Sequence, residues 1–212
     1  MHKIVASGRA GRVITESQLA RMLTGTPQRR YNLVNRALRR GDLLRLKRGR
    51  YLLARDGERT LPHPFVVAQA LRPGCYVSFE SALAFHGWIP ESAPVTLSVV
   101  PGRRRYEKEV PRLGLFRFYP LSLRTGLFLE GADRRVFDGQ AALLAQPLRA
   151  LLDLYCRRKS DYPGLEGVRE DLRIDPDVLR SIDDEDLERL QPVYKHRRMT
   201  AFISALRSEL AG

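Results

Sequence analysis

The sequence has few cysteines, and neither is placed as a metal site would require. Its 212 residues include two, Cys75 and Cys156, which lie far apart in the chain and form no CxxC motif. A structural zinc site needs four suitable ligands, and a disulfide does not persist in a reducing compartment. We therefore expect both to be reduced, small apolar residues of the core, and we expect no metal and no cofactor.

The motifs of several enzyme classes are missing as well. The sequence contains no GxGxxG loop for a dinucleotide and no GxxxxGK[ST] loop for a nucleoside triphosphate. Its one dense group of carboxylates, residues 183–186, is consecutive on an expected helix, so the side chains diverge and cannot surround one ion. Ser78, Ser81 and His86 suggest a nucleophile and a base, but a helix cap, a small first-turn residue and a structural histidine explain them more simply. We expect no enzyme and no catalytic residues.

Long apolar runs are absent too. No stretch approaches the roughly 20 apolar residues that cross a bilayer. The first residues of the sequence lack the apolar core that is typical of a signal peptide. The expected location is the cytoplasm, with no membrane partner.

Acidic residues are scarce in the first part of the chain. Residues 1–60 carry 15 Lys/Arg and 4 Asp/Glu, a balance of +11, whereas residues 61–212 carry 22 and 20, a balance of +2. This asymmetry predicts a basic domain, residues 1–58, joined through a polar segment at residues 55–64 to a near-neutral domain, residues 59–212. The excess charge indicates a polyanionic partner. Because the basic domain offers no helix with large exposed apolar residues for a membrane surface, nucleic acid is the better fit.

The basic domain is organised around residues 26–41, TPQRRYNLVNRALRRG, which predict a helix. Thr26 is placed to cap its N-terminus, Pro27 suits its first turn, and Gly41 suits a left-handed C-cap. Arg30 is expected to point toward the core. The expected apolar stripe comprises Leu33, Val34, Ala37 and Leu38.

The opposite face of this helix carries side chains that suit base edges. It has no acidic residue and comprises Gln28, Asn32, Asn35, Arg36 and Arg39. In the major groove, arginine is complementary to guanine, and asparagine and glutamine are complementary to adenine. We therefore predict a DNA recognition helix, with Arg29 on its flank in contact with phosphate.

The neighbouring segments complete a winged helix-turn-helix. Residues 15–23 predict a helix with a capping box between Thr15 and Gln18, and the short turn through Gly25 joins it to the recognition helix. Residues 43–46 and 51–54 are β-prone runs that predict a hairpin, or wing. The basic residues expected at its tip to contact phosphate or the minor groove are Lys47, Arg48 and Arg50.

Two questions stay open for the basic domain. Residues 1–13 are poor helix material, so either the helix that usually precedes this motif is short or another element covers that side of the core. An ordinary helical hairpin is the simpler alternative to a DNA-binding motif, and a winged helix that binds RNA or protein is a second alternative.

The second domain is predicted to be mixed α/β and to end in helices, so the whole chain is expected to be an α+β protein. Helices are expected at residues 65–71, 79–86, 145–159, 175–190 and 192–210, and strands at residues 94–101, 113–119, 121–129 and 136–137. Two further basic segments, residues 103–105 and 195–198, are either solvated surface or a second nucleic-acid contact.

Two stretches of the second domain are similar to signatures of a known family. YVSFESALAFHGW, residues 76–88, resembles the Ser-x-x-Ser-Ala-Leu-x-x-His-Gly signature of the AbiEi antitoxins. AQPLRALLDLYCRRK, residues 145–159, resembles the family's Ala-x-Pro followed by an Ala-Leu-Leu-Asp helix, with Leu148 and Arg149 where an acidic–basic pair is usual. With a Gly-x-Tyr strand at residues 49–51, the resemblance covers about residues 15–160.

This resemblance implies the antitoxin of a type IV toxin–antitoxin pair. Such a protein represses its own operon by binding promoter inverted repeats, as double-stranded DNA, through its winged helix. The C-terminal domain is implied to be needed for antitoxicity. The implied toxin is nucleotidyltransferase-like and is a functional partner that the antitoxin does not bind directly.

Overall fold

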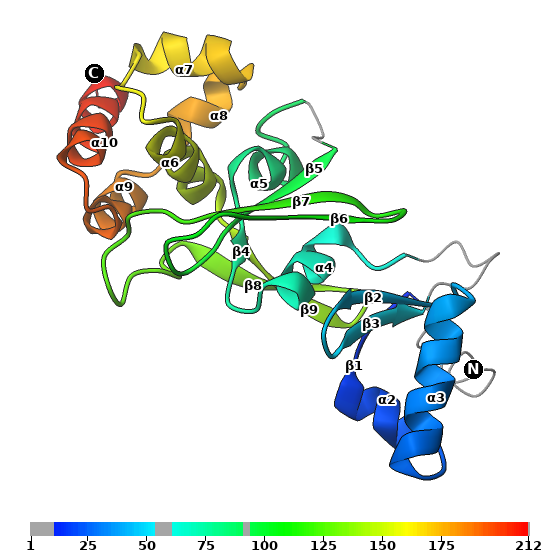
Figure 1. Ribbon diagram of the computed structural model, residues 1–212. Coiled ribbons are helices and arrows are strands. Elements are labelled where there is room, and N and C mark those ends of the chain that lie inside the picture. Colours follow the sequence, from blue (N-terminus) through cyan, green and yellow to red (C-terminus); the bar gives the residue numbers. More distant parts are fainter. Residues whose placement is uncertain (1–10, 54–60, 91–93, 212) are drawn as a thin grey trace. The chain divides into compact units, whose positions relative to one another are not determined.

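The computed structural model describes residues 11–53, 61–90 and 94–211, and the chain divides into two compact units. Unit 1 comprises Met1–Pro73 and Val136–Ala142, and unit 2 comprises Gly74–Arg135 and Leu143–Gly212. Figure 1 shows their helices and strands. Unit 1 contains a helix-turn-helix with a small antiparallel sheet, and unit 2 contains most of a mixed sheet followed by helices. The predicted α+β fold is confirmed.

Unit 1 is built on a three-stranded antiparallel sheet in the order β1-β3-β2. Its strands are β1 (Val13–Thr15), β2 (Leu43–Lys47) and β3 (Arg50–Leu53). One face packs against α2 (Glu16–Met22) and α3 (Pro27–Arg39). The core between this face and the two helices comprises Ile14, Leu19, Ala37, Leu43, Tyr51 and Leu53.

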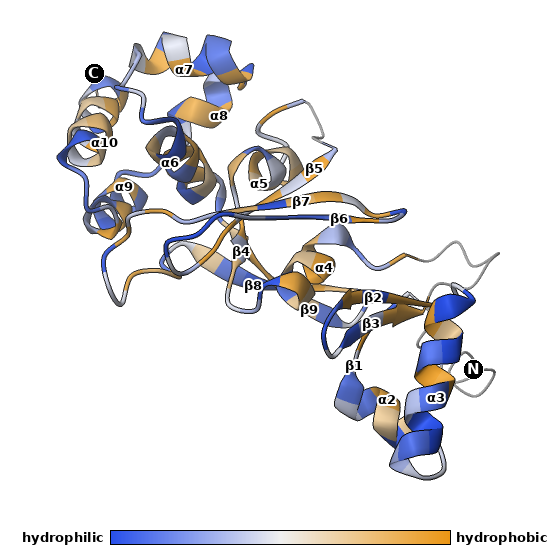
Figure 2. Ribbon diagram, viewed as in Figure 1, coloured by the Kyte–Doolittle hydropathy of each residue, from blue (hydrophilic) through white to orange (hydrophobic). Residues whose placement is uncertain are grey.

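The second face of this sheet is covered as well. Leu52 lies between Tyr51 and Leu53, so it points to the opposite face, and it is fully buried. The cover is α4 (Pro64–Leu71), which packs against β1 and β2. Six of its eight residues are buried, and it is apolar along most of its length (Figure 2). An element after the wing therefore covers the side of the core that a preceding helix would cover, and β1, which the sequence did not predict, leads directly into α2.

This packing also places α4 in a different unit from the one expected. The predicted boundary near residue 58 lies outside the described residues, and the two units divide between Pro73 and Gly74. The difference arises because α4, expected to open the second domain, packs on the sheet of the first.

A segment distant in sequence completes unit 1. Residues 136–142 comprise the end of β8 (Ala132–Phe137), the turn that follows it and the start of β9 (Gln140–Ala145). The Gln140 amide accepts a hydrogen bond from the Val13 nitrogen at 2.8 Å and donates one to the Val13 carbonyl at 3.0 Å. Both bonds satisfy backbone groups of β1, which is an edge strand of its sheet.

The six-stranded sheet has the order β6-β7-β5-β4-β9-β8. Its remaining strands are β4 (Tyr76–Val77), β5 (Val95–Val99), β6 (Tyr106–Val110) and β7 (Gly114–Tyr119). β4 is parallel to β9 and β5 to β7, whereas β4 pairs antiparallel with β5 and β6 with β7. The sequence missed β6, whose polar residues suit an exposed edge, and β9, whose apolar run has no strict alternation.

The described helices of unit 2 are α5 (Phe79–Phe85), α6 (Pro147–Arg158), α7 (Gly164–Leu172), α8 (Pro176–Arg180), α9 (Asp184–Leu190) and α10 (Arg197–Leu210). The single helix expected at residues 175–190 is two, because Asp183 accepts from the Glu185 nitrogen and starts a new helix there. The strand expected at residues 121–129 is wrong. That segment forms turns with one bridge, between Leu123 and Tyr194. No helix among the described residues has the length and apolar character needed to span a bilayer.

α4 begins beside a histidine that is partly removed from water. His63 accepts a hydrogen bond from the Phe65 nitrogen through Nδ1 at 3.3 Å, and its ring stacks on Phe137 with the ring centroids 4.1 Å apart. Burial lowers the pKa of His63, and the nearby Asp138 carboxylate opposes that shift. A protonated ring would also lose the acceptor that caps α4.

We predict that unit 1 loses stability when the pH falls. Because the folded pKa lies below the ordinary value of 6.5, the stabilisation is fully present above pH 6.5 and is lost as pH falls through the folded pKa. The variant His63→Asn keeps an acceptor for the cap but does not titrate. Between about pH 7.5 and 5, the urea midpoint should fall more steeply for the parent than for His63→Asn. His86, whose pKa burial also lowers, is present in both proteins, so equal slopes would contradict the prediction.

Candidate nucleic-acid interface

Short local signals set the ends of both helices of the helix-turn-helix. Thr15 and Gln18 form the predicted capping box of α2, with both hydrogen bonds present. Gly25, in the turn, has φ +104°, and a Cβ there would lie 2.9 Å from the Arg29 side chain. Thr26 then caps α3 by accepting from the Arg29 nitrogen at 3.3 Å. These predicted caps are confirmed.

The inner face of α3 is fixed by packing and by a partly buried polar contact. Ala37 is buried, with Val34 and Leu38 packed around it. Arg30 donates from Nη1 to the carbonyl oxygen of Ala20 in α2 at 3.2 Å, on the core side where it was expected. Contacts from both neighbouring elements therefore fix which side chains α3 turns outward.

The outer face of α3 carries most of the residues predicted to contact bases. Gln28, Arg29, Asn32, Arg36 and Arg39 are all exposed. Gln28 donates from Nε2 to Oδ1 of Asn32 at 3.3 Å, so one amide orients the other. Asn35 is half-buried and lies instead at the cleft between α3 and the wing. Whether these side chains contact DNA stays a prediction.

Leu33 does not belong to the packed face, which corrects the predicted apolar stripe. Leu33 is 37% exposed, although the helical periodicity of the sequence predicted that it packs beside Val34. It lies at the edge of the packed face, about 100° around the helix from Val34. It borders a surface hollow of about 510 Å³ together with Thr26, Gln28, Arg29, Asn32 and Arg36.

The predicted wing is formed by β2 and β3, but its basic residues divide between the two faces of the sheet. Arg45 lies opposite Tyr51, a core residue beneath the helices, so it shares the helix side of the sheet. Arg48, at the tip, borders the same cleft as α3. Arg50 precedes Tyr51, points to the other face and borders a hollow beside α4.

Lys47 is engaged within unit 1. Its Nζ donates to the carbonyl oxygen of Leu71 at 3.1 Å, at the C-terminal end of α4, where the helix dipole favours a cation. Of the three wing residues predicted to contact DNA, only Arg48 borders the cleft beside α3. The sequence analysis missed Arg45, although its position two residues after buried Leu43 signals the shared face.

α3 and the wing border a cleft of about 810 Å³ within unit 1. The Glu16 nitrogen at the start of α2 donates to the Gly49 carbonyl at 3.0 Å, which ties the wing turn to α2. Tyr31 projects from α3 beside this cleft and is 63% exposed. The charged and aromatic residues that border the cleft are Glu16, Arg30, Tyr31, Arg45, Arg48 and Tyr51. Its charge is mainly positive, as a phosphate backbone requires.

In unit 2, the two stretches that carry the family resemblance meet at Asp153. From the first stretch, the Tyr76 hydroxyl and Ser78 Oγ donate to Asp153 Oδ2 at 2.9 and 2.7 Å. From the second, Arg149 Nε donates to Asp153 Oδ1 at 2.9 Å, and both side chains are fully buried. The Tyr194 hydroxyl also donates to Oδ1, at 2.9 Å.

These four donors satisfy both carboxylate oxygens of Asp153. Burial, together with the charge of Asp153, raises the pKa of Tyr76 and of Tyr194 well above the ordinary value, so both hydroxyls stay protonated donors. Burial opposes the charge of Arg149, but Asp153 and the two tyrosines raise its pKa. Arg149 also donates to the Tyr76 hydroxyl at 2.6 Å and to the Glu130 carbonyl. This arrangement is that of a structural cluster.

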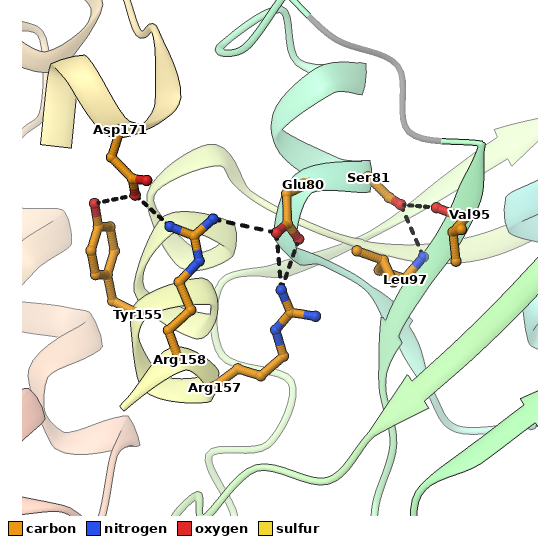
Figure 3. A network of polar contacts seen from close by, with 8 residues as sticks. All are labelled: Glu80, Ser81, Val95, Leu97, Tyr155, Arg157, Arg158 and Asp171. Atoms are coloured by element: carbon orange, nitrogen blue, oxygen red, sulfur yellow. Dashed lines mark hydrogen bonds and ion pairs between the residues drawn. The ribbon is translucent and has the colours of Figure 1, made fainter. Parts of the chain in front are cut away.

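The side chains weighed as catalytic candidates have structural partners. Ser78 makes no side-chain cap to α5, contrary to expectation, because its hydroxyl bonds Asp153. Ser81 Oγ donates to the Val95 carbonyl at 3.0 Å and accepts from the Leu97 nitrogen at 2.9 Å, which joins α5 to β5 (Figure 3). His86 Nε2 donates to the Ala145 carbonyl at 2.9 Å, as expected.

Ion pairs occupy many charged side chains of unit 2. Arg157 pairs with Glu80 at 2.9 Å, and Arg158 pairs with Asp171. Figure 3 shows both pairs. In the acidic segment 183–186, Asp184 pairs with Arg207 and Asp186 pairs with Arg189. Within the described ranges, no group of three or more His, Cys, Asp or Glu is placed to hold a metal ion.

The two basic segments and the cysteines also have defined surroundings. Residues 103–105 are exposed, whereas Arg198 of the other segment donates to the Cys156 carbonyl at 3.3 Å. Cys75 and Cys156 are both buried, and they form no disulfide with each other, as expected. Burial, reinforced by Asp153, raises the pKa of the Cys156 thiol to about 11, so it is protonated at neutral pH.

Comparisons with known proteins give a structural likeness. No family model matches the chain, and no curated protein matches its sequence. The fold is similar to that in the crystal structure of the RV2827C protein from Mycobacterium tuberculosis, with a TM-score of 0.59, 18% sequence identity, and coverage of 97% of this chain and 75% of that one. At this identity the likeness shows a shared fold.

We predict that Arg149→Met strongly destabilises unit 2. The variant leaves the Asp153 carboxylate buried without its cation, which costs about 3–5 kcal/mol. Arg180→Met is the matched control, because it removes the arginine of an exposed pair with Asp177 and should cost less than about 1 kcal/mol. The measurement is urea unfolding of the full chain. Similar losses in the two variants would contradict the structural role of the buried pair.

Proposed function

We propose that this chain is a sequence-specific DNA-binding repressor that acts as the antitoxin of a type IV toxin–antitoxin pair. The observation that carries the DNA-binding part is the outer face of α3. Its exposed amides and arginines project from a helix whose orientation packing fixes, while Arg45 and Arg48 border the cleft along its side.

The chemistry of this surface suits duplex DNA. An α-helix fits the major groove, where Asn32 can bond N6 and N7 of an adenine and Arg36 can bond O6 and N7 of a guanine. Arg45, Arg48 and Arg29 would contact phosphates, which supply affinity without sequence preference. A sugar-phosphate strand would lie along the cleft between α3 and the wing.

The antitoxin part of the proposal rests on the family resemblance. It is supported by the meeting of both signature stretches at Asp153, which gives those motifs a common structural role in unit 2. In this proposal the chain represses its own operon through promoter inverted repeats, in the cytoplasm and without catalysis, metal or cofactor. Its functional partner is a nucleotidyltransferase-like toxin that it does not bind directly.

The antitoxin part has a direct test in the neighbouring reading frame. If that frame encodes a nucleotidyltransferase-like protein, its expression should stop growth, and co-expression of this chain should restore growth. Growth arrest that the chain fails to relieve would refute the antitoxin role and leave DNA binding standing.

The proposed DNA binding predicts that substitutions in α3 weaken binding and alter the preference for particular bases. Asn32→Ala and Arg36→Ala should each weaken binding to the preferred duplex by about 1–3 kcal/mol and relax specificity at one position. Arg180→Met, which removes one positive charge from unit 2, should bind like the parent. Affinity is measured by titration of a duplex selected from a randomised library. Binding by both α3 variants at parental affinity would refute the recognition helix.

The proposed role of the wing predicts a loss of DNA affinity that does not depend on the DNA sequence. Arg45→Ala and Arg48→Ala should weaken binding to every duplex and reduce the slope of log affinity against log salt by about 1 each. Arg50→Ala removes the same charge from the neighbouring strand but from the opposite sheet face, and should leave the slope unchanged. Equal effects of Arg45→Ala and Arg50→Ala would mean that the helix side of the sheet does not face DNA.

A competition experiment separates DNA from RNA as the partner. The selected duplex and a structured RNA of equal length compete for the full chain at one salt concentration. We expect the duplex to win. Preference for the RNA would favour the alternative of a winged helix that serves as an RNA-binding module.

A further inference from the structure

Leu33 is an apolar side chain on the surface of α3 that the proposed function does not yet use. A single exposed leucine is common on protein surfaces and needs no explanation by itself. Leu33 differs from such a residue because its neighbours on α3 are side chains proposed to contact DNA. It lies between Arg29, one turn earlier, and Arg36, nearly one turn later, and directly follows Asn32 in the chain. All of these residues border the same surface hollow.

Leu33 is buried less completely than the leucines that form the core of unit 1. Burial of a leucine normally supplies a large part of the stability of a short helix, and α3 places Val34, Ala37 and Leu38 against the core for that purpose. Leu33 stays 37% exposed among polar and cationic side chains. Docking of this face in a groove would remove its remaining apolar surface from water.

The major groove contains one apolar group that such a side chain can contact. Thymine carries a methyl group at C5, whereas the other three bases present hydrogen-bond donors and acceptors there. Asn32 and Leu33 point about 100° apart around α3, but both border the same hollow. A groove seated over this hollow would therefore bring neighbouring base pairs, which are stacked about 3.4 Å apart, within reach of both side chains.

We propose that Leu33 is a specificity-determining residue that contacts a thymine methyl group next to the base pair contacted by Asn32. This inference rests on the proposed DNA binding and adds one element of the preferred sequence, a thymine at a defined step. It also gives α3 a means of distinguishing thymine from uracil.

The test replaces thymine by deoxyuridine, which removes only the methyl group. The full chain first selects a duplex from a randomised library, and each thymine of that duplex is then replaced singly. At one position, adjacent to the pair whose preference Asn32→Ala relaxes, deoxyuridine should weaken binding of the parent about fourfold, the factor expected for burial of one methyl-sized group. Leu33→Ala should bind the thymine and deoxyuridine duplexes equally.

Two controls make the outcome specific. Tyr31→Ala removes the other exposed apolar side chain of α3, from the flank beside the wing, and should keep the fourfold difference. Because Leu33 is only partly exposed, Leu33→Ala should unfold at a somewhat lower urea concentration than the parent, and binding is compared in buffer without urea, where both proteins are folded.

The possible results are distinguishable. Equal binding of thymine and deoxyuridine duplexes by the parent overturns the methyl contact and leaves the proposed function intact. A difference that persists in Leu33→Ala assigns the methyl contact to another residue and also overturns the inference. Failure of the parent to select any duplex refutes the proposed function and this inference with it.

Discussion

The need to cover both faces of a three-stranded sheet governs the arrangement of unit 1. Tyr51 and Leu53 face α2 and α3, while Leu52 between them is buried on the side of α4. Because side chains alternate along a strand, the same constraint sorts the charged residues of the wing. Arg45 shares the side of Tyr51, and Arg50 shares the side of Leu52. Packing of apolar residues thus decides which arginines share the side of the sheet on which α3 lies.

A second constraint governs unit 2, where a charge is buried and must be satisfied. Asp153 has no access to water, so its stability depends on Arg149 and on three hydroxyl donors. The hydroxyl donors come from β4, the residue after it, and the segment before α10, and Arg149 comes from α6 itself. A buried ion pair is weak evidence for added stability, since an apolar cluster of similar shape can do as well. The stronger consequence of this cluster is geometric, because the Asp153 carboxylate holds α6, β4 and the segment before α10 in fixed positions.

Local signals in the sequence were sufficient for the motif around α3. Thr26, Pro27 and Gly41 determine the ends of that helix through capping and backbone conformation, which depend on nearby residues alone. The sequence could not assign α4 to unit 1, because a helix that is apolar on all sides does not indicate which sheet it covers. The cluster at Asp153 was also missed, because it depends on contacts between distant parts of the sequence. Ser78 precedes a helix as a cap residue would, but the partner of its hydroxyl, Asp153, lies 75 residues away.

The error at Leu33 shows where helical periodicity stops being informative. A stripe drawn through every apolar residue of α3 includes it, but a helix of this size packs through a narrower set, Val34, Ala37 and Leu38. Leu33 then lies on the flank of α3, between the packed face and the groups that suit base edges. A departure from the expected core pattern is a reasonable place to look for function, because packing gives no reason for the part of this apolar side chain that stays exposed. In a DNA groove, contact with a methyl group supplies that reason, and it makes sequence preference depend on an apolar residue as well as on amides and arginines.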